Sequence, residues 1–257
     1  MSAPGPGRFR ERLRAGELLT GTFVKTPSPI LCEVLGQSRL DAVCLDVEHA
    51  PFGRMELDAC LQVLASGPVT PLVRVAAARP EYIMQALDSG AAGVLVPHVR
   101  SADQAADVAR WARFGEGGRG YAGSPRAAGY GTRPMAEHRA ASTKQTAVIA
   151  QIEDLGALDE IDQIAATEGI DALFIGRIDL TVAAEAESPN APEVIEMVER
   201  ICKAARRAGM PVGMFVPTAD EVPRWRALGA SLFMAGSDHA FIRAGANALD
   251  QAMRDPD

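Results

Sequence analysis

The chain is poor in features that mark several other classes of protein. It has only four cysteines in 257 residues, Cys32, Cys44, Cys60 and Cys202, and no two of them form a Cys-x-x-Cys pair. This scarcity argues against a disulfide framework and favours reduced thiols in a cytoplasmic protein. No apolar run is long enough to cross a bilayer, so we expect no membrane partner.

Basic charge is also scarce. The net charge is −7, with 26 Lys and Arg against 33 Asp and Glu. Nucleic-acid-binding surfaces need a concentrated basic face, so we expect no nucleic-acid partner. The arginines at alternate positions from Arg8 to Arg14 have no apolar stretch behind them, so we expect no secretory signal. Residues 1–7 are predicted to be a loose tail.

Short apolar runs alternate with amphipathic segments, which is typical of parallel strands joined by helices. We predict eight strands, at Thr20–Val24, Ala42–Asp46, Pro71–Val75, Gly93–Pro97, Ala147–Ile152, Ala172–Ile175, Val212–Phe215 and Ser231–Ala235. Helical periodicity lies between them, at Met55–Ala65, Glu81–Ser89, Ala102–Phe114, Asp159–Thr167, Pro192–Ala208 and Ala219–Ala227. Eight such units predict an α/β fold, a single-domain (β/α)8 TIM barrel over residues 1–257.

An open, doubly wound sheet is the competing fold. It would usually carry a glycine-rich phosphate turn after the first strand. Here the first strand is followed by Lys25 and the sequence Thr-Pro-Ser-Pro instead. The barrel is therefore the preferred prediction.

Residues 115–143 form an unusually long connection with many glycines, several arginines and little apolar periodicity. Long connections in compact domains are usually functional or disordered. Because this one comes after the fourth strand, we expect it at the catalytic face. Arg119 and Arg126 would then reach an anionic or polyhydroxylated substrate tail, although solvated arginines are an equally good interpretation.

Catalytic residues of barrels lie at the carboxyl ends of the strands. Polar residues occur at or just after six predicted strands: Lys25, Asp46, Glu48, His49, Arg74, His98, Gln151, Glu153 and Asp179. Two of them, Glu153 and Asp179, are carboxylates that could face each other across a pocket. A hard divalent cation prefers such oxygen ligands and leaves other positions to water and substrate. The alternative is that both acids pair with arginines.

This set of residues suits chemistry through an enolate. A divalent metal chelated by a 2-oxo acid polarises the ketone as a Lewis acid. Arg74 adds positive charge beside the developing enolate oxygen. His49 can move the hydroxyl proton, and Asp46 or Glu48 could fix the tautomer of its ring.

Four segments carry a resemblance to a known family: DVEHAP at 46–51, LVRV at 72–75, QIE at 151–153 and FIGRIDL at 174–180. They resemble the metal-dependent class II pyruvate aldolases, such as 4-hydroxy-2-oxoheptanedioate aldolase and 2-dehydro-3-deoxyglucarate aldolase. The wider superfamily includes the citrate lyase beta subunit and malyl-CoA lyases. The resemblance covers roughly residues 21–253.

The resemblance implies a role for each matching residue. Glu153 and Asp179 match the metal ligands, with Mg²⁺, Mn²⁺ or Co²⁺ as the cofactor. His49 matches the catalytic base and Asp46 its partner, and Arg74 matches the residue that holds the pyruvyl oxygen. The implied reaction is the reversible cleavage of a 4-hydroxy-2-oxo acid to pyruvate and an aldehyde through a metal-stabilised pyruvate enolate.

Further matches surround this centre. Gln151 matches a residue of the pyruvyl pocket, and Asp88 matches an assisting acid that a neighbouring subunit can supply. Residues 123–127 are similar to the family's loop over the pocket, which gives candidate substrate contacts at Ser124, Pro125 and Arg126. Family resemblance also implies a homohexamer in which the last helix is exchanged between barrels.

The turn from Gly176 to Asp179 matches the one whose backbone N–H groups hold the substrate carboxylate. The family more often has Pro-Ala where this chain has Arg177-Ile178. Ile178 is expected to narrow the pocket. Arg177 either adds a cation to the pocket or points outward.

The sequence is also compatible with three other functions. One is a thioester lyase of the citrate or malyl-CoA type. Another is a Schiff-base aldolase, for which Lys25 is the candidate because the only other lysines, Lys144 and Lys203, lie away from strand ends. The last is a barrel that binds a 2-oxo acid without turnover.

Overall fold

Runs of consecutive apolar residues, without polar alternation, mark strands that are buried on both faces. The computed structural model describes residues 8–254, so the tail predicted at residues 1–7 lies outside the described residues. Its strands are β1 (Leu19–Val24), β2 (Ala42–Asp46), β3 (Thr70–Arg74), β4 (Gly93–Val96), β5 (Ala147–Ile152), β6 (Ala172–Ile175), β7 (Val212–Val216) and β8 (Ala230–Ser237). All eight predicted strands are confirmed.

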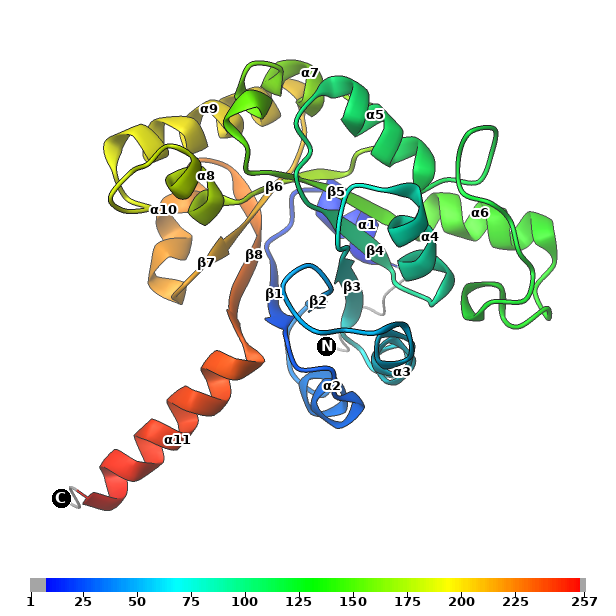
Figure 1. Ribbon diagram of the computed structural model, residues 1–257, viewed down its shortest axis with the longest axis horizontal. Coiled ribbons are helices and arrows are strands. Elements are labelled where there is room, and N and C mark those ends of the chain that lie inside the picture. Colours follow the sequence, from blue (N-terminus) through cyan, green and yellow to red (C-terminus); the bar gives the residue numbers. More distant parts are fainter. Residues whose placement is uncertain (1–7, 255–257) are drawn as a thin grey trace.

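The strands form one closed parallel barrel in chain order (Figure 1). β8 pairs with β1 to close it, with Leu19 opposite Leu232. Inward-facing apolar side chains such as Leu72 and Ile149 fill the barrel, and a second apolar layer lies between strands and helices. The predicted (β/α)8 barrel is confirmed.

Most helices lie on the outside of the barrel between successive strands, whereas α1 (Phe9–Arg14) precedes β1 and α11 (Asp238–Arg254) follows β8 (Figure 1). The helices between strands are α2 (Pro29–Gly36), α3 (Arg54–Leu64), α4 (Pro80–Asp88), α5 (Ala102–Trp111), α6 (Met135–Gln145), α7 (Ile161–Ala165), α8 (Arg177–Ala183), α9 (Pro192–Ala208) and α10 (Val222–Ala227). Short 3-10 turns occur at η2 (Arg126–Ala128), η3 (Leu155–Leu158) and η4 (Ala219–Glu221).

Local signals explain where several helices begin and end. The Ser101 hydroxyl accepts the backbone N–H of Gln104 at 3.2 Å and caps α5. Pro80 opens α4, where its missing N–H costs nothing. Gly209 ends α9 with φ at 65°, a conformation that glycine adopts without strain.

The long connection after α5 differs from the prediction in two ways. Its last part is helix α6, whose sequence shows no apolar period because only His138 of that helix is buried. Its position also differs from the prediction. Helix α5 runs back from the carboxyl end of β4, so the connection lies at the amino-terminal end of the barrel, where it leads into the start of β5. The expectation that residues 115–143 leave from the catalytic face is therefore wrong.

The amino-terminal end of the barrel is closed by α1. Phe9 and Leu13 of this helix are buried against the barrel interior. The Arg10 Nε donates to the buried Asp171 carboxylate at 2.8 Å, and that carboxylate also accepts the Val148 N–H. This end is occupied by structural contacts, so the open end is the one formed by the carboxyl ends of the strands.

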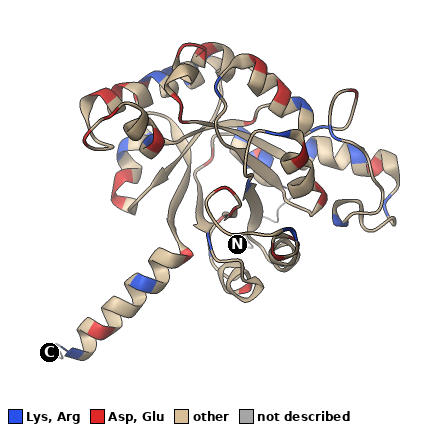
Figure 2. Cartoon of the chain, in the orientation of Figure 1, with Lys and Arg blue, Asp and Glu red and all other residues tan. Residues whose placement is uncertain are grey.

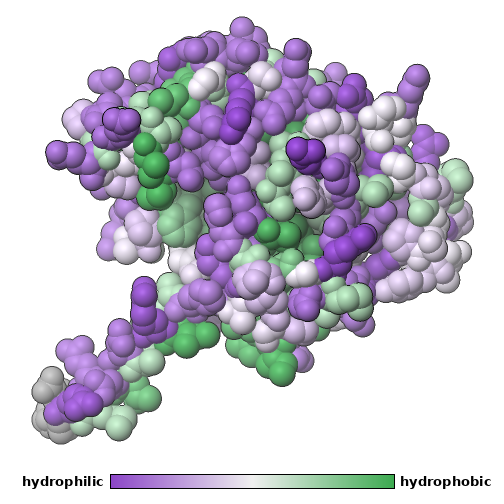
Figure 3. All heavy atoms as spheres, viewed as in Figure 1, coloured by the Kyte–Doolittle hydropathy of each residue, from purple (hydrophilic) through white to green (hydrophobic). Residues whose placement is uncertain are grey.

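The last helix, α11, extends away from the barrel (Figure 1). Its apolar side chains Phe241, Ile242, Leu249 and Met253 are exposed. Figure 3 shows apolar surface on this helix and on the nearby part of the barrel around α2. The helix is anchored at its start by Asp238, whose carboxylate accepts two backbone N–H groups that follow β1.

Charge of both signs is spread over the helices, and Figure 2 shows acidic and basic residues interspersed. Between residues 8 and 254, no helix combines the length and apolar character needed to cross a bilayer. The four cysteines are buried free thiols.

Candidate active site

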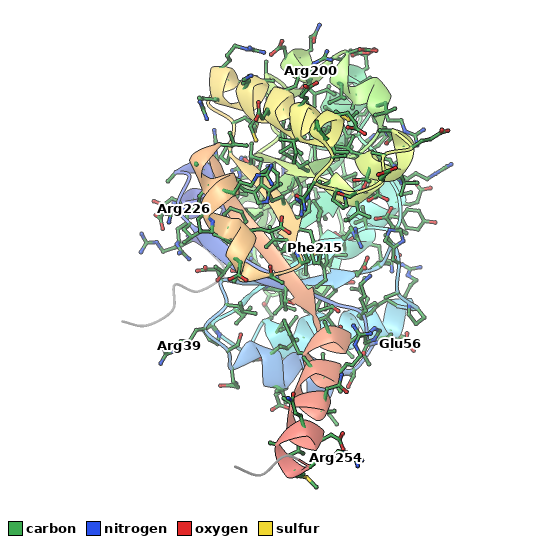
Figure 4. All side chains as sticks on the ribbon, turned by 90° about the vertical axis from the view of Figure 1, so that its left-hand side faces the viewer. Arg39, Glu56, Arg200, Phe215, Arg226 and Arg254 are labelled. Carbon is green, nitrogen blue, oxygen red and sulfur yellow. The ribbon has the colours of Figure 1, made fainter. Side chains whose placement is uncertain are left out.

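A cavity of about 470 Å³ opens at the carboxyl ends of the strands. Its lining includes most of the predicted site: Lys25, His49, Arg74, Gln151, Gly176, Arg177, Ile178 and Asp179. Phe215, labelled in Figure 4, also lines it from β7. Predicted site residues from the ends of five strands thus meet at this cavity, as expected for this fold.

A buried charge network forms one side of this cavity. Arg74 donates from Nε to Asp46 Oδ1 at 2.9 Å and from Nη2 to Oδ2 at 2.7 Å. The two residues are opposite each other in the β2–β3 register, which fixes this geometry. Lys25 Nζ lies 2.9 Å from Asp46 Oδ2. Burial alone would raise the pKa of Asp46, but Arg74 and Lys25 lower it, so the carboxylate is charged and holds Arg74 in place.

His49 has a half-exposed ring beside this network. Its backbone N–H donates to Asp46 Oδ1 at 3.2 Å, so Asp46 fixes the backbone of His49 and makes no hydrogen bond with its ring. The ring Nε2 lies 3.7 Å from Glu48 Oε2. Partial burial and the positive charge of Arg74 lower the pKa of His49, which favours a neutral imidazole that can accept a proton.

Glu153 follows β5 and is buried. Its Oε1 accepts the His98 backbone N–H at 2.8 Å, and its Oε2 accepts a hydrogen bond from Gln151 Nε2. Burial raises the pKa of Glu153 above its usual range. Gly176 packs directly on this side chain, because a Cβ there would lie 2.6 Å from the Cβ of Glu153. Only glycine fits at that position of the turn.

Three side chains around Glu153 could hold a metal ion. One ligand atom from each of Glu48, His98 and Glu153 lies within 4.8 Å of the others. Glu48 Oε2 has no hydrogen-bond partner within the described part of the chain, and burial together with the charge of Glu153 raises the pKa of Glu48 to about 7. Such a concentration of buried acid fits a divalent cation.

Of the two predicted metal ligands, Glu153 belongs to this cluster, whereas Asp179 lines the cavity and lies outside the cluster. Asp179 is exposed on α8, and its charge contributes to the raised pKa of Glu153. Partial burial would lower the pKa of His98, but its hydrogen bond to Asp154 and the charges of Glu153 and Glu48 raise it. The neighbouring acids therefore favour the protonated form of the ring, and a metal ion at this cluster would bind the neutral form.

Sequence reasoning did not group Glu48, His98 and Glu153. Glu48 entered only as a possible partner of His49, and His98 only as a polar residue at a strand end. His98 has a φ of 55°, unusual for a residue with a side chain, and this turn brings its N–H onto Glu153. The Pro-His sequence after β4 was the available signal.

Arg177 lines the cavity, yet its guanidinium is committed elsewhere. Its Nη2 contacts Glu221 Oε2 at 2.6 Å, and the group lies 4.9 Å from the centre of the Trp225 ring. Arg177 is buried and ion-paired, so the interpretation that it adds a free cation to the pocket is wrong. Ile178 stays at the cavity edge, 48% exposed.

Asp88 and the 123–127 segment lie away from this cavity. Asp88 is the last residue of α4, which ends at the amino-terminal side of the barrel, 3.6 Å from Arg119. Arg126 contacts Asp58 at 2.6 Å. Ser124 and Pro125 precede η2 on the same side. Within one subunit these residues do not meet the residues at the strand ends.

Comparison with known proteins agrees with the fold and with the predicted class of enzyme. Residues 19–244 match the family described as HpcH/HpaI aldolase/citrate lyase. The 5-keto-4-deoxy-D-glucarate aldolase of Salmonella arizonae is 35% identical over 95% of both chains. The protein of the same name from Klebsiella pneumoniae is 34% identical over 97% of both.

Solved structures give the same result. An HpcH/HpaI aldolase/citrate lyase family protein from Burkholderia cenocepacia has a TM-score of 0.91 and 32% identity, covering 97% of this chain and 100% of that one. The HpcH/HpaI aldolase from Desulfitobacterium hafniense has a TM-score of 0.88 and 26% identity, covering 97% of each chain.

The fold and the site define a (β/α)8 carbon–carbon lyase. The chain belongs to the HpcH/HpaI aldolase/citrate lyase family. It is an enzyme of the pyruvate-dependent aldolase class, as its sequence motifs predicted.

Proposed function

We propose that this enzyme reversibly cleaves a 4-hydroxy-2-oxo acid to pyruvate and an aldehyde, with a divalent cation bound beside Glu153. The observation that carries the proposal is the arrangement of three groups at one end of the barrel. A fixed cation at Arg74 and a neutral imidazole at His49 line the cavity, and the buried acid Glu153 contacts its lining residue Gln151. Glu153 suits metal binding, Arg74 suits stabilisation of the developing negative charge, and His49 suits proton transfer.

Glu153 and Asp179 are the proposed ligands of the cation, and Glu48 and His98 also lie close to Glu153. The oxygen-rich set suits Mg²⁺, Mn²⁺ or Co²⁺. When bound, the ion would polarise the ketone of the substrate as a Lewis acid. Gln151 keeps the Glu153 carboxylate in place through its side-chain amide.

Arg74 is proposed to hold the oxygen on which negative charge develops. Asp46 fixes its guanidinium before the substrate arrives, and a preorganised charge of this kind stabilises a transition state most effectively. The Gly176 N–H donates to the Ile152 carbonyl at 2.9 Å, so the backbone N–H groups of residues 177–179 are proposed to hold the substrate carboxylate. Gly176 permits the close packing that this turn needs.

His49 is proposed to take the proton of the 4-hydroxyl group. Its neutral ring accepts that proton as the C3–C4 bond breaks, which leaves an aldehyde on one side. The electron pair of the broken bond passes to the pyruvyl half. Protonation of that carbon then gives the methyl group of pyruvate.

Replacement of His49 tests this function. We expect His49→Ala to lower kcat for pyruvate release by at least about a hundredfold, the scale of a lost general base. His239→Ala is the matched control, because that exposed histidine lies outside the cavity lining. Near-normal turnover by His49→Ala would exclude the proposed role.

Lys25 would be the nucleophile of a Schiff-base aldolase. In the structure its ammonium group is paired with Asp46, and the neighbouring acids suit a cation-dependent reaction better. Borohydride reduction with pyruvate should therefore leave Lys25 unmodified. A thioester lyase would instead condense acetyl-CoA with glyoxylate, and we expect no such product.

We further propose a homo-oligomer in which α11 packs on a neighbouring barrel. The exposed apolar side chains of α11 and the exposed Ile30 and Val34 of α2 support this. A neighbouring subunit would also bring Asp88 and residues 124–126 to the cavity. The expected hexamer can be checked by light scattering, and the cytoplasmic location stays a prediction.

A further inference from the structure

The cavity has two chemically different walls. The polar wall carries the groups that are proposed to bind the pyruvyl half of the substrate. The opposite wall comes from the ends of β7 and β8 and the starts of α8 and α11, and its members are Ile178, Phe215, Pro217, Gly236, Ser237 and Ala240. Of these only Ser237 has a polar side chain, and none is charged.

Aromatic side chains form the floor between the two walls. The Phe23 ring lies 6.4 Å from the Phe174 ring, edge-on, and 6.2 Å from the Phe215 ring. Phe23 and Phe174 are buried, whereas Phe215 is partly open to the cavity. The packing of the three rings gives a fixed apolar surface that continues into the wall formed by Phe215.

Every lysine and arginine among the lining residues already has a carboxylate partner. Lys25 and Arg74 both pair with Asp46. Arg177 pairs with Glu221, and its side chain is only 3% exposed. A carboxylate on the substrate tail would therefore meet no free positive charge along the apolar wall, and an unpaired buried charge is costly.

We infer that the aldehyde half of the substrate is apolar, an unbranched aliphatic or aromatic aldehyde without a carboxylate or several hydroxyls. This inference rests on the proposed function and adds the substrate class to it. The tail lies along Ile178, Phe215 and Pro217 while the pyruvyl half occupies the polar wall. Arg119 and Arg126, expected from the sequence to attract an anionic tail, lie at the other end of the same barrel. Where a neighbouring subunit brings Arg126 to the cavity, that guanidinium is already paired with Asp58.

The condensation direction tests the inference with pyruvate, Mn²⁺ and a panel of aldehydes. The panel contains propanal, butanal, hexanal and benzaldehyde, with succinic semialdehyde and glyceraldehyde as charged and hydroxylated counterparts. We expect kcat/KM to rise from propanal to hexanal by up to about fourfold per buried methylene. Hexanal should exceed succinic semialdehyde by about tenfold or more.

Two variants locate the effect. Ile178→Ala should reduce the preference for hexanal over succinic semialdehyde by about fivefold, because apolar contact is lost. Val182→Ala is the matched control, since Val182 lies on the same helix, is 73% exposed and is not part of the cavity lining. The control should keep the wild-type preference.

Exchange of the pyruvate methyl protons in D₂O separates failure of this inference from failure of the proposed function. Faster reaction with succinic semialdehyde or glyceraldehyde than with hexanal would overturn the apolar assignment. Metal-dependent exchange without condensation of any apolar aldehyde would also overturn it, while leaving pyruvate activation intact. Absence of both exchange and condensation would overturn the proposed function, and the inference with it.

Discussion

Arg177 and Glu221 form an ion pair with an Nη2–Oε2 distance of 2.6 Å, and the same guanidinium lies over the Trp225 ring. The pair connects the first residue of α8 with the segment that follows β7. In the resembling aldolases the turn at this position more often contains proline. Here a side-chain contact restrains the turn that carries Asp179.

Arg177→Ala should loosen this turn. We expect the free energy of unfolding to fall by about 2–3 kcal/mol, because Glu221 is left partly buried without its partner. We also expect Mn²⁺ to bind more weakly, since Asp179 is two residues away, and Arg177→Lys should restore part of that affinity. Urea unfolding and calorimetric titration with Mn²⁺ measure the two effects.

Arg224→Ala is the control for that variant. Arg224 is exposed and lies 4.6 Å from the same Trp225 ring, so it shares the ring but not the contact with Glu221. Arg224→Ala should change the free energy of unfolding and the Mn²⁺ affinity only slightly. Unchanged Mn²⁺ affinity in Arg177→Ala would mean that the ion pair stabilises the fold without positioning the turn.

The strands could be predicted because almost every one of their residues is buried, so a simple apolar run marks each one. Helix α6 could not, because its sequence has no apolar face to detect. The sequence pattern does not show at which end of the barrel the chain lies after α5. For this reason the prediction placed Arg126 at the wrong end. The approach of Glu48 and His98 to Glu153 depends on the backbone turn at His98, which the sequence does not encode as a pattern.

Glu153→Gln should abolish most of the metal binding. We expect the Kd for Mn²⁺ to rise by about a hundredfold or more, with loss of pyruvate release, because the central carboxylate is neutralised. Asp159→Asn is the control, since that carboxylate is 86% exposed on the outer surface. Calorimetric titration and turnover measure the outcome.

Two more variants distinguish the two candidate sets of metal ligands that share Glu153. Asp179→Asn should weaken Mn²⁺ binding strongly if the proposed ligand pair is correct. Loss of affinity in Glu48→Gln alone would instead assign the ion to the cluster of Glu48, His98 and Glu153.

Asp238 should make the attachment of α11 sensitive to acid. Burial alone would raise its pKa, but hydrogen bonds from the Thr26 side chain and from the Lys25 and Thr26 N–H groups lower the pKa below the usual range of an aspartate. A carboxyl group with a lowered folded-state pKa stabilises the fold above its unfolded pKa, and the contribution is lost as the pH falls through the folded value.

Asp238→Asn tests this contribution. We expect the variant to be less stable than the wild type by about 1–3 kcal/mol between pH 5 and 8. The difference should shrink as the pH falls below about 4, where the carboxyl group of the unfolded chain binds a proton, and it should vanish below the lowered pKa of the folded state. Urea unfolding across this range measures it, and a difference that stays constant down to pH 2 would contradict the assignment.

The most direct test of the account is pyruvate release from a 4-hydroxy-2-oxo acid with an alkyl tail, before and after treatment with EDTA. We predict that release stops on chelation and returns when Mg²⁺, Mn²⁺ or Co²⁺ is restored, while Glu153→Gln stays inactive under every condition. Release that continues in EDTA at the original rate would contradict the proposed metal-dependent aldolase.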